Sequence, residues 1–408
     1  MTKTTQDGMQ IPLGSDVAST PHRQYQPYLE AVWGFKNHWY PALFSHELTQ
    51  EGLQAIRIAG VPILLRRVDG EVFAVRDQCL HRGVQLSARP LCLTEDTVTC
   101  WYHGFTYGVR DGKLRTIVAA PDDELIGKVG IQTFPVREVN EMIFVFVGDE
   151  GFEPLPDIAE DLPSRIPADK PQHVAYPLDP DTMLLGIRRV ASSNWRLAVE
   201  NGFDPGHLLM HRDCTVVLAH DIALPLGINP NSPEAIQVIE DDNGPKGISN
   251  EYEGGHYDLV LENELLGLRA QGGQPLPGLR TSMYVPGVLM VESWPQPGMT
   301  QYEWYVPIDD KTHMYWEVLA RRCTTPDERA RFAYECKHVW REEALFGFNN
   351  HDVFAREQME NFYSSDGGPG WEDEQLCAMD AVIVGWRKLA ARYNRGIQTP
   401  QAHPSPRC

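Results

Sequence analysis

The sequence predicts an α+β protein in which a small antiparallel β domain precedes a larger domain of strands and helices. Three observations predict it. Short β-rich runs alternate with Asp-Gly turn pairs between about residues 45 and 150. The proline-rich and acidic stretch GFEPLPDIAEDLPSRIPADKPQ is then typical of a connection between domains. Beyond it, further strand-like runs lead into a long segment whose apolar residues recur at helical spacing.

We therefore expect three parts along the chain. Residues 1–34 form a polar arm and a short amphipathic helix, 35–155 the β domain, and 156–408 the α+β domain, an antiparallel sheet flanked by helices. In this last part, the runs SMYVPGVLMVESWP and TQYEWYVPI predict a hairpin. The helical segment starts at TPDERARF.

The composition excludes several classes of protein. Of the 408 residues, 42% are hydrophobic and 23% charged, as in folded proteins with a core. The formal net charge of −20 argues against nucleic acid or an anionic membrane surface as a partner. No apolar run approaches the ~20 residues that span a bilayer, and MTKTTQDGMQ lacks the core of a signal peptide. We expect a cytoplasmic protein whose eight sparse cysteines are mostly free thiols.

The first chemical motif combines Cys79-x-His81 with Cys100-x-x-His103. Each half contributes one thiolate and one imidazole, whereas a zinc finger usually groups its cysteines in one half and its histidines in the other. The mixed pairing suits a [2Fe–2S] cluster in which two cysteines bind one iron and two histidines bind the other. A zinc site, or four unrelated residues, is the alternative.

The ligand type has a consequence for electron transfer. Replacing two thiolates by neutral imidazoles raises the reduction potential to roughly −150 mV and above, against about −400 mV for an all-cysteine plant-type cluster. Such a cluster can accept electrons from a carrier and pass them to a catalytic iron. Gly83 and Gly104 follow the two motifs, and we expect them to let loop backbone approach the cluster and donate N–H groups to its sulfurs.

The second motif is His207-x-x-x-His211. On a helix, residues four apart project from one face, and Asp204 and Pro205 predict the start of that helix. Two surface histidines would explain the pair equally well. A zinc protease is excluded because Leu208 stands where its catalytic glutamate would lie. The other reading is a 2-His-1-carboxylate site for non-haem Fe(II), which keeps positions open for O₂.

The third ligand of that site has to come from elsewhere in the chain. The segment GFNNHDVFARE offers Asp352, with His351 beside it. Helical neighbours point about 100° apart, so the two side chains are not expected to bind one ion together. The spacing alone leaves the choice between them open.

With both motifs in place, the chain resembles the α subunit of Rieske non-haem iron aromatic-ring-hydroxylating oxygenases, and within that family the branch of carbazole 1,9a-dioxygenase terminal oxygenases. The resemblance runs from about residue 35 to the C-terminus. It rests on the segments FKNHWYP, DQCLHRGVQLS, TCWYHGFTY, SNWRLAVENGFDPGH, LPGL, VPGVL, EWYVPID, GFNN and GIQT with QAH.

The resemblance implies a Rieske domain followed by a catalytic domain, with one [2Fe–2S] cluster and one mononuclear Fe(II) per subunit. The implied cluster ligands are the four residues of the first motif, Cys79, His81, Cys100 and His103. The implied iron ligands are His207, His211 and Asp352, which decides against His351. Because the two centres of one chain lie far apart in this family, its members assemble head to tail as trimers. We expect a homotrimer in which Asp204 bridges His207 to His103 of the adjacent subunit.

The resemblance also implies the reaction. The chain would insert both atoms of O₂ into the 1,9a position of carbazole, using electrons from a ferredoxin that a reductase refills from NADH. The implied pocket residues are Gly202, Leu208, Trp294, Gln301, Glu303 and Phe348. The carbonyl of Gly202 would accept the N–H of carbazole. For four of these residues the alternative is ordinary packing in the core: Trp294, Gln301, Glu303 and Phe348.

Several questions stay open at this point. Arg82, Lys113 and Arg115 are candidates for a basic patch that docks the ferredoxin. Another aromatic substrate, or a Rieske electron carrier without catalysis, is the rival function. The N-terminal arm has no match in the family, and the segment from about 230 to 280, where the pocket cover should lie, aligns poorly with it.

Overall fold

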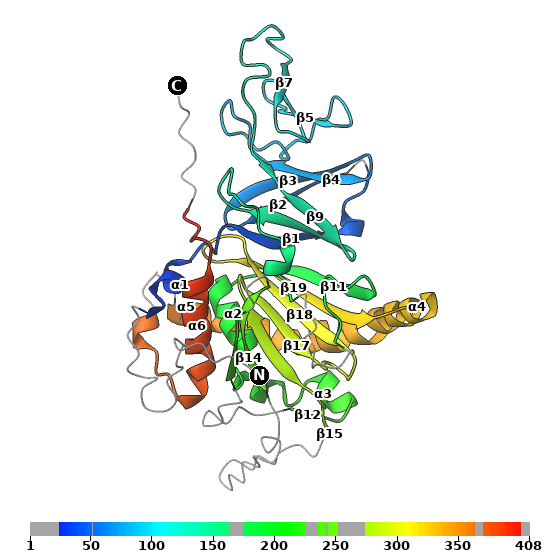
Figure 1. Cartoon of the computed structure of the whole chain (residues 1–408), viewed down its shortest axis with the longest axis vertical. Helices are drawn as coiled ribbons and strands as arrows, with labels where there is room; N and C mark the ends of the chain where they lie inside the picture. The colour runs from blue at the N-terminus through cyan, green and yellow to red at the C-terminus, as the bar shows by residue number, and fades with distance from the viewer. Residues whose placement is uncertain are drawn as a thin grey trace.

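The computed structural model describes most of the chain, in seven stretches: 24–50, 52–163, 174–224, 236–240, 244–251, 274–363 and 370–400. The expected N-terminal arm and most of the segment from 230 to 280 lie outside the described residues. Two units follow one another along the long axis of the molecule (Figure 1), the first built of strands and the second of a sheet with helices. The predicted α+β class is thereby confirmed. In the described part, no helix is long and apolar enough to cross a membrane.

The first unit contains three small antiparallel sheets, with strand orders β1-β10-β9, β2-β3-β4-β8 and β5-β6-β7. The short helix α1 (Gln26–Glu30) lies beside the helices of the second unit (Figure 1). The strands of the first unit are β1 (His38–Phe44), β2 (Leu53–Ile58), β3 (Val61–Val68), β4 (Glu71–Arg76), β5 (Thr97–Thr99), β6 (Phe105–Gly108), β7 (Leu114–Ile117), β8 (Thr133–Phe134), β9 (Val136–Val139) and β10 (Met142–Val147). The predicted Asp69-Gly70 turn joins β3 to β4 with positive φ at both residues (51° and 83°), the backbone of a two-residue hairpin.

The second unit is a seven-stranded antiparallel sheet of order β11-β19-β18-β17-β16-β14-β13. Its strands are β11 (Thr182–Ala191), β13 (Ile236–Glu240), β14 (Lys246–Glu251), β16 (Arg280–Tyr284), β17 (Val288–Glu292), β18 (Thr300–Pro307) and β19 (His313–Arg322), with the separate pair β12 (Ile222–Ala223) and β15 (Gln274–Pro275). The expected hairpin is present, since β17 pairs with β18 in the register Val288 to Trp304.

The helices of the second unit lie against this sheet (Figure 1) and include α2 (Trp195–Phe203), α3 (Thr215–Ala219), α4 (Pro326–Glu335), the π-helical segment η5 (Cys336–Phe348), α5 (Asn349–Tyr363) and α6 (Ala381–Tyr393). The long predicted helical span is α4, η5 and α5 in succession. It begins where the Thr325 side chain accepts the amide of Glu328, a capping box that satisfies exposed N–H groups.

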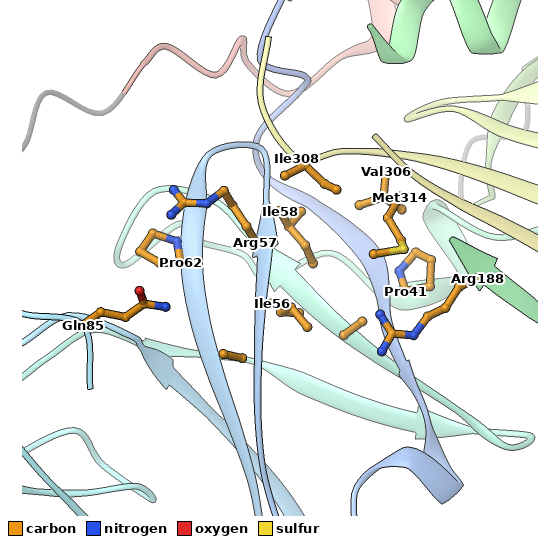
Figure 2. Close-up of a pocket in the computed structure, with 12 residues that line it drawn as sticks. Pro41, Ile56, Arg57, Ile58, Pro62, Gln85, Arg188, Val306, Ile308 and Met314 are labelled. Atoms are coloured by element: carbon orange, nitrogen blue, oxygen red, sulfur yellow. The ribbon is translucent and has the colours of Figure 1, made fainter. Parts of the chain in front are cut away.

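The two units share an apolar core. The ring of Phe144 in β10 lies 6.3 Å from that of Trp304 in β18. A cavity of about 280 Å³ opens at the same junction (Figure 2), lined by Ile56 and Ile58 of β2 and by Val306 and Met314, with Arg57 and Arg188 at its edges. None of the residues predicted to carry chemistry lines this cavity. The functional site therefore has to be sought elsewhere.

Candidate active site

The first motif occupies two similar loops at the far end of the first unit, one before β5 and one between β5 and β6 (Figure 1). In each loop the glycine amide donates to the cysteine carbonyl four residues earlier, Gly83 to Cys79 and Gly104 to Cys100, both at 2.9 Å. The glycines have φ of +71° and +75°, which side chains rarely adopt. Their own amides close the loops, so other loop residues have to supply the N–H groups expected at the cluster sulfurs.

The loops bring the four predicted ligands together. Cys79 and Cys100 are buried, while His81 and His103 reach the surface of the tip. The Nδ1 atoms of the two imidazoles face each other at 3.0 Å, and their rings are inclined by 72°. Two nitrogens bound at about 2.0–2.1 Å to one tetrahedral metal lie about 3.4 Å apart. Two buried thiols and two converging imidazoles at the surface fit a [2Fe–2S] cluster in which two cysteines bind one iron and two histidines bind the other.

One neighbour of the cluster site was not predicted. The hydroxyl of Tyr107, in β6, lies 3.3 Å from the sulfur of Cys79 and 3.2 Å from the amide nitrogen of Leu80. Since the amide donates to the hydroxyl, the hydroxyl proton is free to point at the sulfur. Burial, the chief cause, and the neighbouring thiol of Cys100 raise the pKa of Cys79.

The second motif begins where α2 ends, which corrects the prediction that Asp204 starts a helix. Asp204 is the C-cap of α2, and its backbone is extended at φ −67° and ψ 121°. The reason is Pro205, because a proline disfavours helical backbone in the residue before it. The Asp204 carboxylate accepts the amide of Gly206 at 2.7 Å.

His207 and His211 lie on a 3₁₀ turn (His207–His211), not on the predicted α-helical face. At three residues per turn, positions four apart point about 120° from each other. The two rings, 5.4 Å apart and inclined by 86°, converge on Asp352 of α5. Their Nε2 atoms lie 3.6 Å (His207) and 3.3 Å (His211) from the same carboxylate oxygen.

His351 lies on the other side of His211. Its Nδ1 is 3.1 Å from the carbonyl of Met210 and 3.4 Å from the sulfur of Cys214. The geometry therefore groups Asp352, and not His351, with the two Nε2 atoms. Three such ligand atoms within 4.8 Å of one another could hold a metal ion.

The protonation states suit a metal site. Burial lowers the pKa of His211, although the Asp352 carboxylate opposes this shift. For Asp352, burial would raise the pKa, but His211 and the Arg356 guanidinium outweigh it and hold the pKa well below its usual range. The Nδ1 of His207 contacts the backbone carbonyl of Asp204, which fixes the proton on Nδ1 and leaves the Nε2 lone pair for a metal. A carboxylate and two neutral imidazoles are the donors that non-haem Fe(II) takes.

A cavity of about 50 Å³, partly open to solvent, adjoins this triad. All six predicted pocket residues line it, together with His207 and Asp352: Gly202, Leu208, Trp294, Gln301, Glu303 and Phe348. Its walls are aromatic, since Phe348 stacks on His211 at 3.6 Å and packs against Trp294 at 4.6 Å between centroids. Five residues that the sequence had not indicated complete the lining: Leu224, Leu279, Thr281, Leu289 and Val291.

One side of the cavity is polar. Glu303 is buried, and its two oxygens accept hydrogen bonds from the Gln301 amide and the Tyr305 hydroxyl, both at 2.5 Å. Burial raises the pKa of Glu303, and the charge of Arg356 opposes that rise. The Gln301 side-chain oxygen is buried and accepts no hydrogen bond from any described residue. It is a vacant acceptor in the cavity wall.

Gly202 also lines the cavity. A Cβ at this position would overlap the hydroxyl of Tyr305 and come within 3.2 Å of Leu289, so only glycine fits. Its carbonyl lies in the last turn of α2, where helical N–H donors run out. The backbone of α2 thereby forms part of the cavity surface.

Comparisons with known proteins agree with this geometry. A model of the Rieske [2Fe-2S] domain matches residues 38–135, and a model described as homotrimeric ring hydroxylase matches 146–398. The chain is 42% identical to the terminal oxygenase component of carbazole 1,9a-dioxygenase from Metapseudomonas resinovorans, over 93% of this chain and 96% of that protein.

Two solved structures are similar over nearly the whole chain. The 2-oxoquinoline 8-monooxygenase component has a TM-score of 0.88 and 50% identity, covering 97% of this chain and 93% of that one. The oxygenase in a reduced complex with ferredoxin, from carbazole 1,9a-dioxygenase, has a TM-score of 0.82 and 38% identity, covering 95% and 96%. The resemblance found in the sequence is thereby confirmed.

Proposed function

The chain belongs to the α subunits of Rieske ring-hydroxylating oxygenases, and on that premise we propose that it is the terminal oxygenase of a multicomponent system acting on a fused, nitrogen-containing aromatic. One observation carries the proposal: two imidazole nitrogens and the Asp352 carboxylate converge at the edge of an aromatic cavity. A Rieske electron carrier would need neither the cavity nor the second set of ligands.

The metal ligands divide into two sets. Cys79, Cys100, His81 and His103 hold the cluster, and His207, His211 and Asp352 hold Fe(II). Bound there, the iron supplies the O₂ activation that side chains alone cannot provide. The protein's part is to orient both imidazoles and to hold the substrate beside the site.

The cavity favours a flat substrate with an N–H group. Trp294 and Phe348 offer ring faces, while the Gly202 carbonyl and the vacant oxygen of Gln301 accept hydrogen bonds. Carbazole meets this description, and we propose its angular 1,9a-dioxygenation, with its N–H donated to Gly202. The product is a hemiaminal diol that opens to an aminobiphenyl-diol. The identity to the carbazole 1,9a-dioxygenase component supports this choice.

A second candidate is hydroxylation of a 2-oxoquinoline. The similar monooxygenase component is 50% identical, above the values for the two carbazole relatives. A lactam presents an N–H beside a carbonyl, and the primary amide of Gln301 offers the complementary acceptor and donor. In this reaction one atom of O₂ enters the ring and the other leaves as water.

Electrons come from a ferredoxin, and a reductase refills the ferredoxin from NADH. The docking surface is the basic patch (Arg82, Lys113 and Arg115), whose three residues are exposed near the cluster tip. In one chain the cluster loops belong to the first unit, at the end that carries β5 and β7 (Figure 1), whereas the iron ligands belong to the second unit. We propose a head-to-tail homotrimer in which Asp204 connects His207 to the cluster of the adjacent subunit.

Product analysis tests the proposed function. The holoenzyme is combined with a ferredoxin, its reductase and NADH, and supplied with carbazole, 2-oxoquinoline, dibenzofuran or naphthalene under ¹⁸O₂. Mass spectrometry distinguishes dioxygenation, with two labelled oxygens in the product, from monooxygenation, with one. Asp352→Ala, which keeps the cluster ligands, is the control for background chemistry. If the ferredoxin reduces the cluster but no substrate gains labelled oxygen, the proposal is wrong.

A further inference from the structure

A thiol lies directly behind the iron site. Cys214 follows the 3₁₀ turn, and its amide donates to the carbonyl of His211 at 3.0 Å. This turn buries the side chain, which is 3% exposed, between two nearly parallel imidazoles inclined by 12°. The sulfur is 3.5 Å from Nδ1 of His211 and 3.4 Å from Nδ1 of His351.

The positions of the ring protons follow from the partners. If the Nε2 of His211 binds the metal, its Nδ1 has to carry the proton of the neutral ring. Among the described residues, the sulfur of Cys214 is the hydrogen-bond partner within reach of that nitrogen. His351 has an alternative, because the Met210 carbonyl at 3.1 Å only accepts hydrogen bonds and takes its Nδ1 proton.

The two iron-ligating histidines are thus held in different ways. The Nδ1 of His207 is fixed by the carbonyl of Asp204, which is part of the backbone. The Nδ1 of His211 is fixed by a side chain. Outer partners of this kind set the tautomer and the orientation of a ligating imidazole.

We propose that Cys214 is a positioning residue of the mononuclear iron site, whose sulfur accepts a hydrogen bond from Nδ1–H of His211 and keeps Nε2 directed at Asp352 and the metal. The inference rests on the proposed function, because it presumes that His207, His211 and Asp352 hold iron. Cys214 touches neither substrate nor metal in this arrangement and acts only through His211.

His211, Cys214 and His351 could instead hold a metal of their own, since their ligand atoms also lie within 4.8 Å of one another. The geometry disfavours this reading. The Nε2 of His211 faces Asp352 at 3.3 Å, so His211 would have to bridge two ions and lose both ring protons. A hydrogen bond from His211 to the thiol requires neither change.

Iron retention tests the proposal without relying on turnover. Wild type, Cys214→Ala and Cys214→Ser are purified as holoproteins and mixed anaerobically with a chromophoric Fe(II) chelator. The visible absorbance of the cluster reports in the same sample that the chain is intact. Cys323→Ala is the matched control, because Cys323 is also a buried free thiol, 1% exposed, and no hydrogen bond joins it to an iron ligand in the described part.

Loss of an outer partner of a ligating histidine typically weakens metal binding about 10–100-fold. We expect Cys214→Ala to release its mononuclear iron about tenfold faster than wild type, at the lower end of that range, because sulfur is a weak hydrogen-bond acceptor. Cys214→Ser should regain most of the retention, and Cys323→Ala should match wild type. The EPR spectrum of the nitric-oxide adduct of the ferrous site should change in Cys214→Ala alone.

The outcomes separate this inference from the proposed function. A wild-type chain with about three irons, combined with unchanged release and an unchanged EPR spectrum in Cys214→Ala, overturns the inference alone. Equal loss of iron in Cys323→Ala also overturns it, because the effect would then be one of packing. A wild-type chain that binds only the two irons of the cluster overturns both. An extra metal equivalent that disappears in Cys214→Ala would establish the separate metal site instead.

Discussion

The hydroxyl of Tyr107 should set part of the reduction potential of the cluster. Tyr107→Phe removes one oxygen, 3.3 Å from the Cys79 sulfur, from a side chain that is 0% exposed, and leaves the packing of the ring unchanged. Reduction adds negative charge to the cluster, so a donor to a ligating sulfur stabilises the reduced state more than the oxidised one. The variant should therefore have the lower potential.

The size of the shift follows from the bond. A hydrogen bond to a charged group contributes about 1.5–3 kcal/mol, but both redox states keep it and only the difference counts, which we take as about 1 kcal/mol. Since about 1.4 kcal/mol corresponds to about 59 mV for one electron, the potential should fall by about 40 mV.

A redox titration followed by the visible absorbance of the cluster measures this shift. Tyr102→Phe is the control, because Tyr102 is 52% exposed and its ring packs 3.8 Å from that of His103, yet no hydrogen bond links its hydroxyl to a described cysteine. The reasoning is refuted if Tyr107→Phe leaves the potential unchanged or raises it. It is also refuted if Tyr102→Phe lowers it equally.

Four further predictions follow from the site. Asp352→Asn should reduce the iron content from about three to about two per chain and abolish product, while the cluster spectrum stays unchanged; full iron content would contradict the ligand assignment. Gly202→Ala should lower the free energy of unfolding by about 1–3 kcal/mol in thermal melts, because its Cβ overlaps the Tyr305 hydroxyl, and an unchanged melt would disprove that clash. Asp204→Asn should keep both metals and the backbone carbonyl that contacts His207, but it neutralises the carboxylate proposed to face the adjacent subunit, so reoxidation of the reduced cluster in stopped-flow absorbance should slow; an unchanged rate would rule out the bridging role of this side chain. Charge reversal across the basic patch should raise the ferredoxin KM and weaken its salt dependence; no change would dismiss the patch as the docking surface.

Much of the fold could be predicted because its signals are local. The Asp69-Gly70 pair specifies a hairpin turn through the positive φ of its own residues, and β17 and β18 show their alternation within a few residues. The cluster ligands were equally accessible, since each half of the motif lies within a single loop. Local patterns of this kind do not depend on how the chain packs.

One prediction failed and one choice stayed open, both because they depend on the direction in which the backbone runs. Asp204 and Pro205 suit a helix start by composition, but the effect of the proline on the preceding residue ends α2 there instead. The choice between His351 and Asp352 depends on how the π-helical segment passes into α5, which spacing does not show.

Tyr107 and Cys214 were missed for a different reason. Tyr107 reaches Cys79 from a strand 28 residues further along the chain, and Cys214 looks like any buried thiol until His211 and His351 are placed around it. Their roles come from tertiary contacts, and no sequence pattern marks them.

The most direct test of the two-centre account is a single turnover without ferredoxin. The holoenzyme is reduced chemically, freed of reductant and mixed with O₂ and carbazole or 2-oxoquinoline, and the EPR signal of the reduced cluster is followed alongside product. The account predicts that the EPR signal is lost at the rate at which product forms. In Asp352→Ala, no product should form and the signal should persist over the same period. Product without oxidation of the cluster, or rapid oxidation of the cluster in Asp352→Ala, would contradict it.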